Sequence, residues 1–136
     1  GGLELRKAIA AKLLRENSLT FKPEHIVVGI GAKEILFHLF LSLLNDGDEV
    51  LIFAPYWVSY ADQVVAAGGV PVAIPPPAGF PEQTIDASAV MQYATAKTKA
   101  IILNSPNNPA GYVTSEEELR SIGKLVKDTP VGKYND

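Results

Sequence analysis

Three asparagine side chains lie in one short stretch, Asn104 to Gly111, which reads Asn-Ser-Pro-Asn-Asn-Pro-Ala-Gly. Its two X-Pro pairs keep the backbone extended and prevent a helix, and Gly111 allows a positive φ. The apolar run before it, Ala100 to Leu103, is typical of a buried strand. Ligands bind beyond the carboxyl ends of strands in open α/β sheets, so an amide here is placed to hydrogen-bond an anion or a phenolic oxygen. The alternative is a stiff surface loop whose asparagines bond its own backbone.

A second candidate is Gly31-Ala32-Lys33, where the predicted helix Glu34 to Leu44 begins. Small residues let free backbone N–H groups approach a ligand, and the helix dipole favours an anion, so phosphate is the natural ligand. Lys33 can contribute its N–H while its side chain faces solvent. The alternative is an ordinary strand-to-helix turn. A dinucleotide fingerprint would need a third glycine where Glu34 stands, and the Gly-Lys-Ser/Thr of a Walker motif is absent.

The third candidate is Trp57, with Tyr56 and Tyr60 near it in the chain. An aromatic face can stack on a heteroaromatic ring and exclude water, whereas the alternative is a plain core tryptophan. His25 and His38 lack the spacing of metal ligands. No Ser/His/Asp elbow occurs either, so neither a metal centre nor a hydrolase is indicated.

These candidates are positioned by alternating elements that the apolar patterns predict. The predicted helices are 3–17, 34–44, 59–67, 87–95 and one beginning near Thr114, and the predicted strands are 25–30, 49–54, 70–74 and 100–103. Asp86 is a predicted helix cap, and Thr114 and Ser115, with Glu117 and Glu118 three residues on, form two overlapping capping boxes. The alternation predicts an α/β fold, a three-layer, mainly parallel sheet covered by helices. All three candidates would then follow strands at the same edge of the sheet.

The composition argues against several classes of function. Hydrophobic residues make up 47% of the 136, which is enough for a core without disulfides, and cysteine is absent. The formal net charge is −3 and no basic run occurs, so nucleic acid is not an expected partner. No apolar stretch approaches the roughly 20 residues that span a bilayer, so no membrane is expected either.

Together, the three segments resemble one protein family. Asn-Ser-Pro-Asn-Asn-Pro-Ala-Gly resembles the NPTG-type box of the class I/II aminotransferases, fold-type I enzymes that depend on pyridoxal 5′-phosphate, with Ala110 in place of the usual Thr. The opening Gly-Leu-Glu-Leu-Arg-Lys-Ala-Ile-Ala is similar to the phrase before the family's large domain. The stretch Pro55 to Tyr60 resembles the family's ring-stacking segment, and Trp57 is most like the bacterial-type aspartate and prephenate aminotransferases.

The resemblance implies a role for each candidate. The cofactor's phosphate would bind Gly31-Ala32-Lys33, and its pyridine ring would stack on Trp57. Asn108, directly before a proline, would bond the cofactor's 3′-oxygen and, with Trp57, help to seat the substrate carboxylate. Asn104 and Asn107 would hold the shape of the loop.

The resemblance also implies that part of the active site is missing. The family's acid, in an Asp-Glu-x-Tyr strand, and its Schiff-base lysine, in a Ser-x-Ser/Thr-Lys segment, have no match in this sequence. We therefore expect no catalytic residue in this chain, which would be inactive by itself. The expected organisation is one partial domain: a leading helix (1–18), a cofactor-binding α/β segment of the large domain (19–127) and a tail (128–136).

The complete enzyme would transfer an amino group between an amino acid, aspartate by resemblance, and a 2-oxo acid. It would be a homodimer in the cytoplasm, with an organelle left open as an alternative. Two other readings remain open: a self-standing nucleotide-binding α/β module, and a truncated, non-catalytic product.

Overall fold

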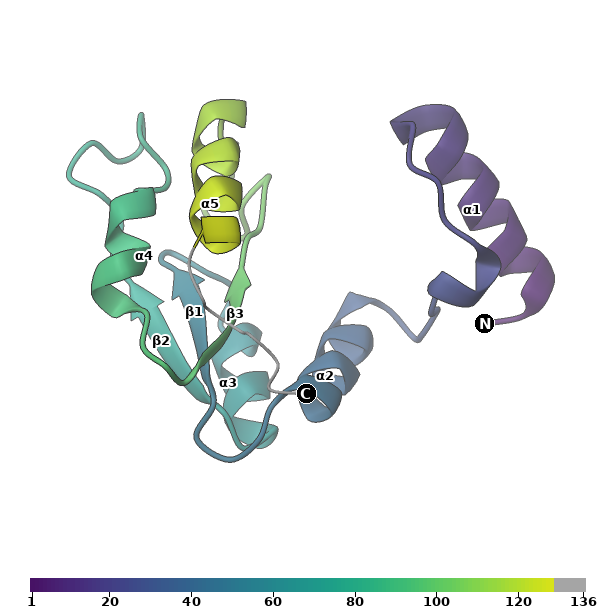
Figure 1. Cartoon of the computed structure of the whole chain (residues 1–136), viewed down its shortest axis with the longest axis horizontal. Coiled ribbons are helices and arrows are strands. Elements are labelled where there is room, and N and C mark those ends of the chain that lie inside the picture. Colours follow the sequence, from purple (N-terminus) through teal and green to yellow (C-terminus); the bar gives the residue numbers. More distant parts are fainter. Residues whose placement is uncertain (129–136) are drawn as a thin grey trace. The chain divides into compact units, whose positions relative to one another are not determined.

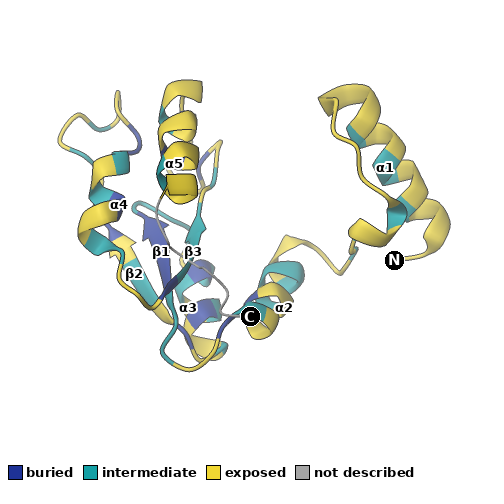
Figure 2. Ribbon diagram, in the orientation of Figure 1, coloured by how far each residue is buried: buried dark blue, intermediate teal, exposed yellow. Residues whose placement is uncertain are grey.

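The computed structural model describes residues 1–128, and the chain divides into two compact units. The first unit is Gly1–Leu39, and the second begins at Phe40. The elements of both are labelled in Figure 1, and Figure 2 colours them by burial. The buried hydrophobic residues belong to the second unit, which holds the sheet.

The first unit is built from helices. It contains α1 (Leu3–Asn17), the short 3-10 helix η1 (Pro23–His25) and the greater part of α2 (Ala32–Leu43). The helix predicted over 3–17 is confirmed. Ser18 ends it in the left-handed conformation, with φ of 56°, and its N–H returns to the Leu14 carbonyl at 3.2 Å. The Arg6 guanidinium donates to the Pro23 carbonyl at 3.2 Å and so links α1 to η1.

The strand predicted over residues 25–30 does not form. His25 ends the 3-10 helix, and residues 26–30 have no strand pairing. Val27 and Ile30, two apolar residues of this run, are 79% and 91% exposed. An apolar run has the composition of a buried strand, but a strand also needs a neighbour for its backbone groups. No described segment of the first unit is a strand that could pair with it.

The second unit contains a parallel sheet of three strands in the order β2-β1-β3. The strands are β1 (Glu49–Phe53), β2 (Val70–Ile74) and β3 (Thr98–Ile102). The central strand pairs Leu51 with Val72 on one side and with Ile101 on the other. The other three predicted strands are therefore confirmed to within two residues, because each is a continuous apolar run flanked on both sides by helices.

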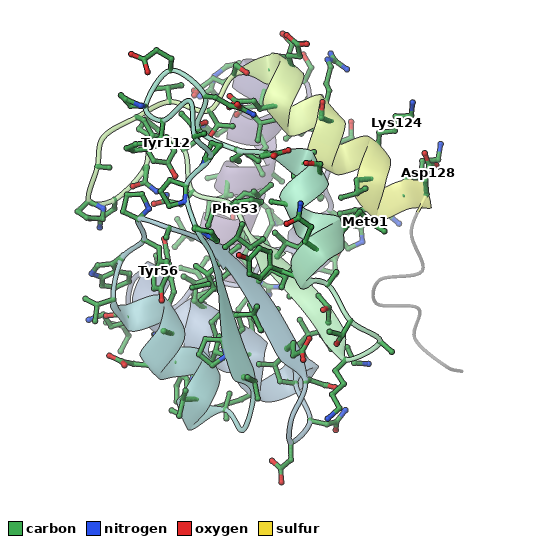
Figure 3. All side chains as sticks on the ribbon, turned by 90° about the vertical axis from the view of Figure 1, so that its left-hand side faces the viewer. Phe53, Tyr56, Met91, Tyr112, Lys124 and Asp128 are labelled. Atoms are coloured by element: carbon green, nitrogen blue, oxygen red, sulfur yellow. The ribbon has the colours of Figure 1, made fainter. Side chains whose placement is uncertain are left out.

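Helices cover both faces of this sheet. The connections are α3 (Ser59–Ala66) between β1 and β2, α4 (Ala87–Tyr93) between β2 and β3, and α5 (Glu116–Asp128) after β3. The chain steps from β1 to β2 in one direction and from β2 to β3 in the other, so right-handed crossovers place α3 and α4 on opposite faces. Figure 3 shows the strands between α3 and the α4–α5 pair. The predicted three-layer α/β architecture is confirmed in this unit.

The core of the second unit follows the alternation of the central strand. Leu51 and Phe53 pack with Ile74, Val90 of α4 and Ile122 of α5. Val50 and Ile52 point to the other face, where α3 contributes the fully buried Val64. The Asp86 cap is also confirmed, because its carboxylate accepts the Ser88 N–H at 2.8 Å. Of the predicted tail (128–136), Asp128 is instead the last residue of α5, and residues 129–136 lie outside the described part.

None of the helices in residues 1–128 is long and apolar enough to cross a membrane.

Candidate functional site

Two of the predicted segments lie at one edge of the sheet. Because β1 and β3 are parallel neighbours, the residues after Phe53 and those after Ile102 leave the sheet at the same edge. We name these segments the Trp57 loop (residues 54–58) and the Asn108 loop (residues 103–113). In Figure 3, Tyr56 and Tyr112, one from each loop, lie at the Phe53 end of the strands.

Trp57 is half-buried, and its ring is supported from within the same segment. Tyr60, which is buried, packs against it edge to face, with ring centroids 5.5 Å apart and an interplanar angle of 88°. The Tyr60 N–H also donates to the Trp57 carbonyl at 3.0 Å. An edge-to-face neighbour fixes an indole while leaving part of its surface accessible. This suits a stacking role better than the alternative of a plain core tryptophan.

The three asparagines of the Asn108 loop differ in their surroundings. The Asn104 carboxamide oxygen accepts the Asn108 N–H at 2.9 Å, which fastens the loop to itself. Asn107 is 8% exposed and is hydrogen-bonded through its amide and its backbone. Asn108 is exposed, and its side chain has no hydrogen-bond partner among residues 1–128. Of the three, Asn108 is the amide available to a ligand.

The bases of the two loops are packed together. The space between them is a cavity of about 10 Å³, whose polar lining includes Tyr56, Tyr60, Asn104, Asn107 and Tyr112. Such a volume holds about one water molecule. A ligand larger than water therefore has to bind on the outer surface of these loops, where the Asn108 side chain is exposed.

The third predicted segment belongs to the first unit. Gly31 has φ of 91°, and a Cβ there would meet nothing within 4 Å, so its peptide is open to solvent before α2 begins at Ala32. Gly31, Ala32 and Lys33 are all exposed. The strand expected before them is absent, so they do not follow a strand of the sheet as Trp57 and Asn108 do. The structure places them within their own unit only.

A carboxylate already lies at the first turn of α2. Glu34 accepts a hydrogen bond from the Ile30 N–H, and a Cβ added to Gly29 would collide with the Glu34 carboxylate. From the sequence alone, Glu34 was noted only as the residue that interrupts a glycine fingerprint. The sequence signal was an acidic residue in the first helical turn, where it interacts favourably with free N–H groups.

A second carboxylate, Glu118, joins α5 to the segment before α4. It completes the predicted capping box with Ser115, whose N–H donates to it at 2.8 Å, while the Glu118 N–H donates to the Ser115 hydroxyl at 3.2 Å. Glu118 also accepts the N–H groups of Thr84 and Ile85 at 2.6 and 2.9 Å. The other predicted capping pair, Thr114 with Glu117, is not observed. The contact with residues 84 and 85 had no sequence signal, because it joins positions more than thirty residues apart.

These donors change the pKa of Glu118. Burial of the carboxylate raises the pKa, but the Ile85 N–H, the hydroxyl and N–H of Ser115 and the Thr84 N–H outweigh burial and lower the pKa to about 2. A charged carboxylate that accepts several N–H groups favours its ionised form. The ionised form of Glu118 is therefore stabilised in the folded chain relative to the unfolded chain.

Replacing Glu118 with Gln is expected to lower the free energy of unfolding at neutral pH by about 1–2 kcal/mol, since charge-assisted hydrogen bonds are lost. In the unsubstituted chain, the stabilisation from ionised Glu118 is present above the ordinary pKa of 4.5 and is lost as the pH falls toward 2. Urea unfolding at several pH values measures both effects. Glu117→Gln makes the same charge change at an exposed neighbour. Equal losses in the two variants would contradict the role of Glu118.

The chain is similar to known aminotransferases. Residues 1–131 match the family described as aminotransferase class I and II. The chain is 50% identical over 135 residues to the probable aspartate/prephenate aminotransferase of Aquifex aeolicus, covering 98% of this chain and 34% of that protein. It is 48% identical over 134 residues to the aspartate aminotransferase of Bacillus sp. strain YM-2, covering 96% of this chain and 33% of that one.

Solved structures agree with the fold. The aspartate aminotransferase of Thermus thermophilus with maleate aligns with a TM-score of 0.87 at 42% identity, over 93% of this chain and 33% of that one. The enzyme of Rhizobium meliloti aligns with a TM-score of 0.90 at 38% identity, over 96% of this chain and 32% of its own. The predicted fold class is confirmed by these likenesses. The chain spans about a third of the length of the relatives it matches.

Proposed function

Because this chain belongs to the class I and II aminotransferases, a family that depends on pyridoxal phosphate, we propose that it is the cofactor-binding segment of an aspartate aminotransferase. The complete enzyme would exchange an amino group between aspartate and a 2-oxo acid as a homodimer. The names of its relatives support aspartate as the amino donor. Within the chain, we assign residues 1–18 to a leading helix and 19–128 to the α/β segment, whose last helix ends at Asp128.

One observation carries the proposal for the second unit. The exposed Asn108 amide, which has no protein partner among the described residues, shares a sheet edge with the half-buried Trp57. An aromatic face and a free amide donor match the two recognisable parts of the pyridine ring, its π-surface and its 3′-oxygen. In our proposal, Trp57 covers the ring. Asn108 donates to the 3′-oxygen and helps to orient the substrate carboxylate.

The first unit supplies donors that fit a phosphate. At the start of α2, the backbone N–H groups of Gly31, Ala32 and Lys33 precede the first full turn of hydrogen bonding, and the helix dipole favours an anion there. We assign the phosphate to these three residues. When bound, pyridoxal phosphate supplies an electron sink for bonds at the substrate α-carbon. The lysine and the acid that this chemistry needs are not among the residues we assign here.

The negative charge of Glu34 at the start of α2 provides a test of the proposed phosphate site. Its carboxylate bonds the Ile30 N–H beside the proposed phosphate donors, so it stabilises the helix start but repels a phosphate. Removing the charge while keeping the shape separates the two effects. Glu34→Gln should therefore bind phosphate more tightly.

The test is calorimetric titration with pyridoxamine 5′-phosphate, which lacks the aldehyde that reacts with surface lysines. Unphosphorylated pyridoxamine should bind more weakly. Asn108→Ala should lose about 5- to 10-fold in affinity, as for one hydrogen bond of about 1 kcal/mol. Glu34→Gln should gain about 2- to 5-fold, the size of a charge effect at a helix terminus.

Two control variants, Asn17→Ala and Glu24→Gln, change exposed residues outside the proposed donor set, and both should leave the affinity unchanged. NAD and ATP are the competing ligands. Tighter binding of either nucleotide than of pyridoxamine 5′-phosphate would favour a nucleotide-binding module and overturn the proposal. Intact mass, compared with the encoded reading frame, tests whether the chain is a truncated product.

A further inference from the structure

We propose that Asn107 is a positioning residue, which holds the Trp57 loop and the Asn108 loop in one fixed arrangement so that the ring face and the free amide act on the same ligand. The inference rests on the function proposed above. It concerns the second unit alone.

The side chain of Asn107 crosses from one loop to the other. Its Nδ2 group donates to the Pro55 carbonyl at 3.1 Å, across 52 positions of sequence. Pro55 lies two residues before Trp57, so this bond fixes the backbone that carries the indole. The same Nδ2 group donates to the Tyr112 hydroxyl oxygen at 3.1 Å. The two amide hydrogens thus bind one acceptor in each loop.

The remaining groups of Asn107 shape its own loop. Its carboxamide oxygen accepts the Ala110 N–H at 3.1 Å. Its backbone N–H donates to the Tyr112 carbonyl at 2.8 Å, and its carbonyl accepts the Gly111 N–H at 2.9 Å. These bonds hold the chain after Asn107 in a turn. Asn108 is therefore held next to a residue that is itself fastened to the Trp57 loop.

Tyr112 gives Asn107 a firm support. Its ring packs edge to face against Phe80, with centroids 5.5 Å apart and an angle of 85°. Burial, followed by the charge of Glu118, raises the pKa of Tyr112, and its hydroxyl oxygen accepts the Asn107 hydrogen. Because the ring is packed, the hydroxyl is a fixed acceptor for Asn107.

The chemistry of this position favours asparagine. Two donors and one acceptor are needed in a single short, planar group, at a site that is 92% shielded from solvent. Aspartate has the same shape but would face the Pro55 carbonyl with an oxygen. Alanine would enlarge the adjoining cavity of about 10 Å³ and leave the Pro55 carbonyl without its partner. A ligand would then have to order both loops on binding, which lowers its affinity.

The chain contains one tryptophan, so its fluorescence reports on the Trp57 loop directly. In the ligand-free chain, Asn107→Ala and Asn107→Asp should each raise acrylamide quenching of Trp57 about twofold. Both should also weaken pyridoxamine 5′-phosphate binding about 10-fold, which is about 1.4 kcal/mol. Asn104→Ala is the matched control, because Asn104 bonds only its own loop in the described contacts. It should leave the quenching of Trp57 unchanged.

Each outcome decides a separate point. If the original chain does not bind pyridoxamine 5′-phosphate, the proposed function fails, and the ligand-free quenching still decides whether Asn107 holds the Trp57 loop. If the original chain binds but Asn107→Ala leaves quenching or affinity unchanged, the positioning role is overturned. An Asn107→Asp variant that behaves like the original would show that shape, and not hydrogen-bond donation, matters at this position. Circular dichroism checks that each variant is folded.

Discussion

Replacing Leu51 with Ala is expected to lower the free energy of unfolding by about 2–5 kcal/mol, the usual cost of such a truncation in a packed core. Leu51 lies in the middle of the central strand and is 0% exposed. It packs with Phe53, Ile74, Val90 and Ile122, which come from the sheet and from both helices on one face. The cavity left by the deletion would be surrounded by structure that cannot easily collapse into it.

The expected loss is large because domains are stable by only about 5–15 kcal/mol in total. Urea unfolding followed by circular dichroism measures it. Leu119→Ala on α5 is the control, since Leu119 is 40% exposed and should cost less than about 1 kcal/mol. A loss at Leu51 as small as at Leu119 would show that β1 is not the centre of the folded core. Since β1 leads directly into the Trp57 loop, the same variant should also weaken ligand binding.

Local patterns predict most of the second unit. The strand at Val70–Ile74 and the start of the helix at Ala87 were predicted at the observed residues, because an apolar run and an Asp cap are signals contained within a few positions. The class of the fold follows from the same patterns. Alternating strands and helices allow few arrangements other than a parallel, helix-covered sheet.

The strand predicted at residues 25–30 failed for a physical reason that sequence patterns do not contain. Val27 and Ile30 have the side chains of a buried strand, but burial depends on which segments lie beside them. The same limit applies to the candidate site. The bond from Asn107 to Pro55 and the bonds from Glu118 to residues 84 and 85 join distant positions. Sequence reasoning recognised Trp57 and Asn108 as candidates, but it gave Asn107 only a local role.

The second prediction concerns catalytic activity, which we expect this chain to lack when it is alone. Mixed with pyridoxal phosphate, aspartate and 2-oxoglutarate, this chain by itself should give no steady transamination. The reaction needs a lysine that binds the cofactor covalently and moves the α-proton of the substrate, together with an acid at the ring nitrogen. We propose that this chain does not supply either group.

The positions of the lysines support this expectation. In the second unit, Lys97 and Lys99 lie at the amino end of β3, opposite the edge that carries Trp57 and Asn108. Lys124 and Lys127 lie in the second half of α5, which runs back from that edge toward the amino ends of the strands. None of these four lysines is therefore placed to reach a ring stacked on Trp57. In the first unit, Lys33 is assigned to the phosphate.

Borohydride reduction in the presence of pyridoxal phosphate, followed by peptide mapping, tests the lysines directly. Labelling should be weak and spread over several of the nine lysines, and the aspartate/2-oxoglutarate assay should stay at background. The aspartate aminotransferase of Bacillus sp. strain YM-2, of which this chain matches 33%, is the positive control under the same conditions. Stoichiometric labelling of a single lysine, together with steady turnover, would mean that this segment contains a complete catalytic centre. The roles assigned here to Trp57 and Asn108 would then have to be rebuilt around that lysine.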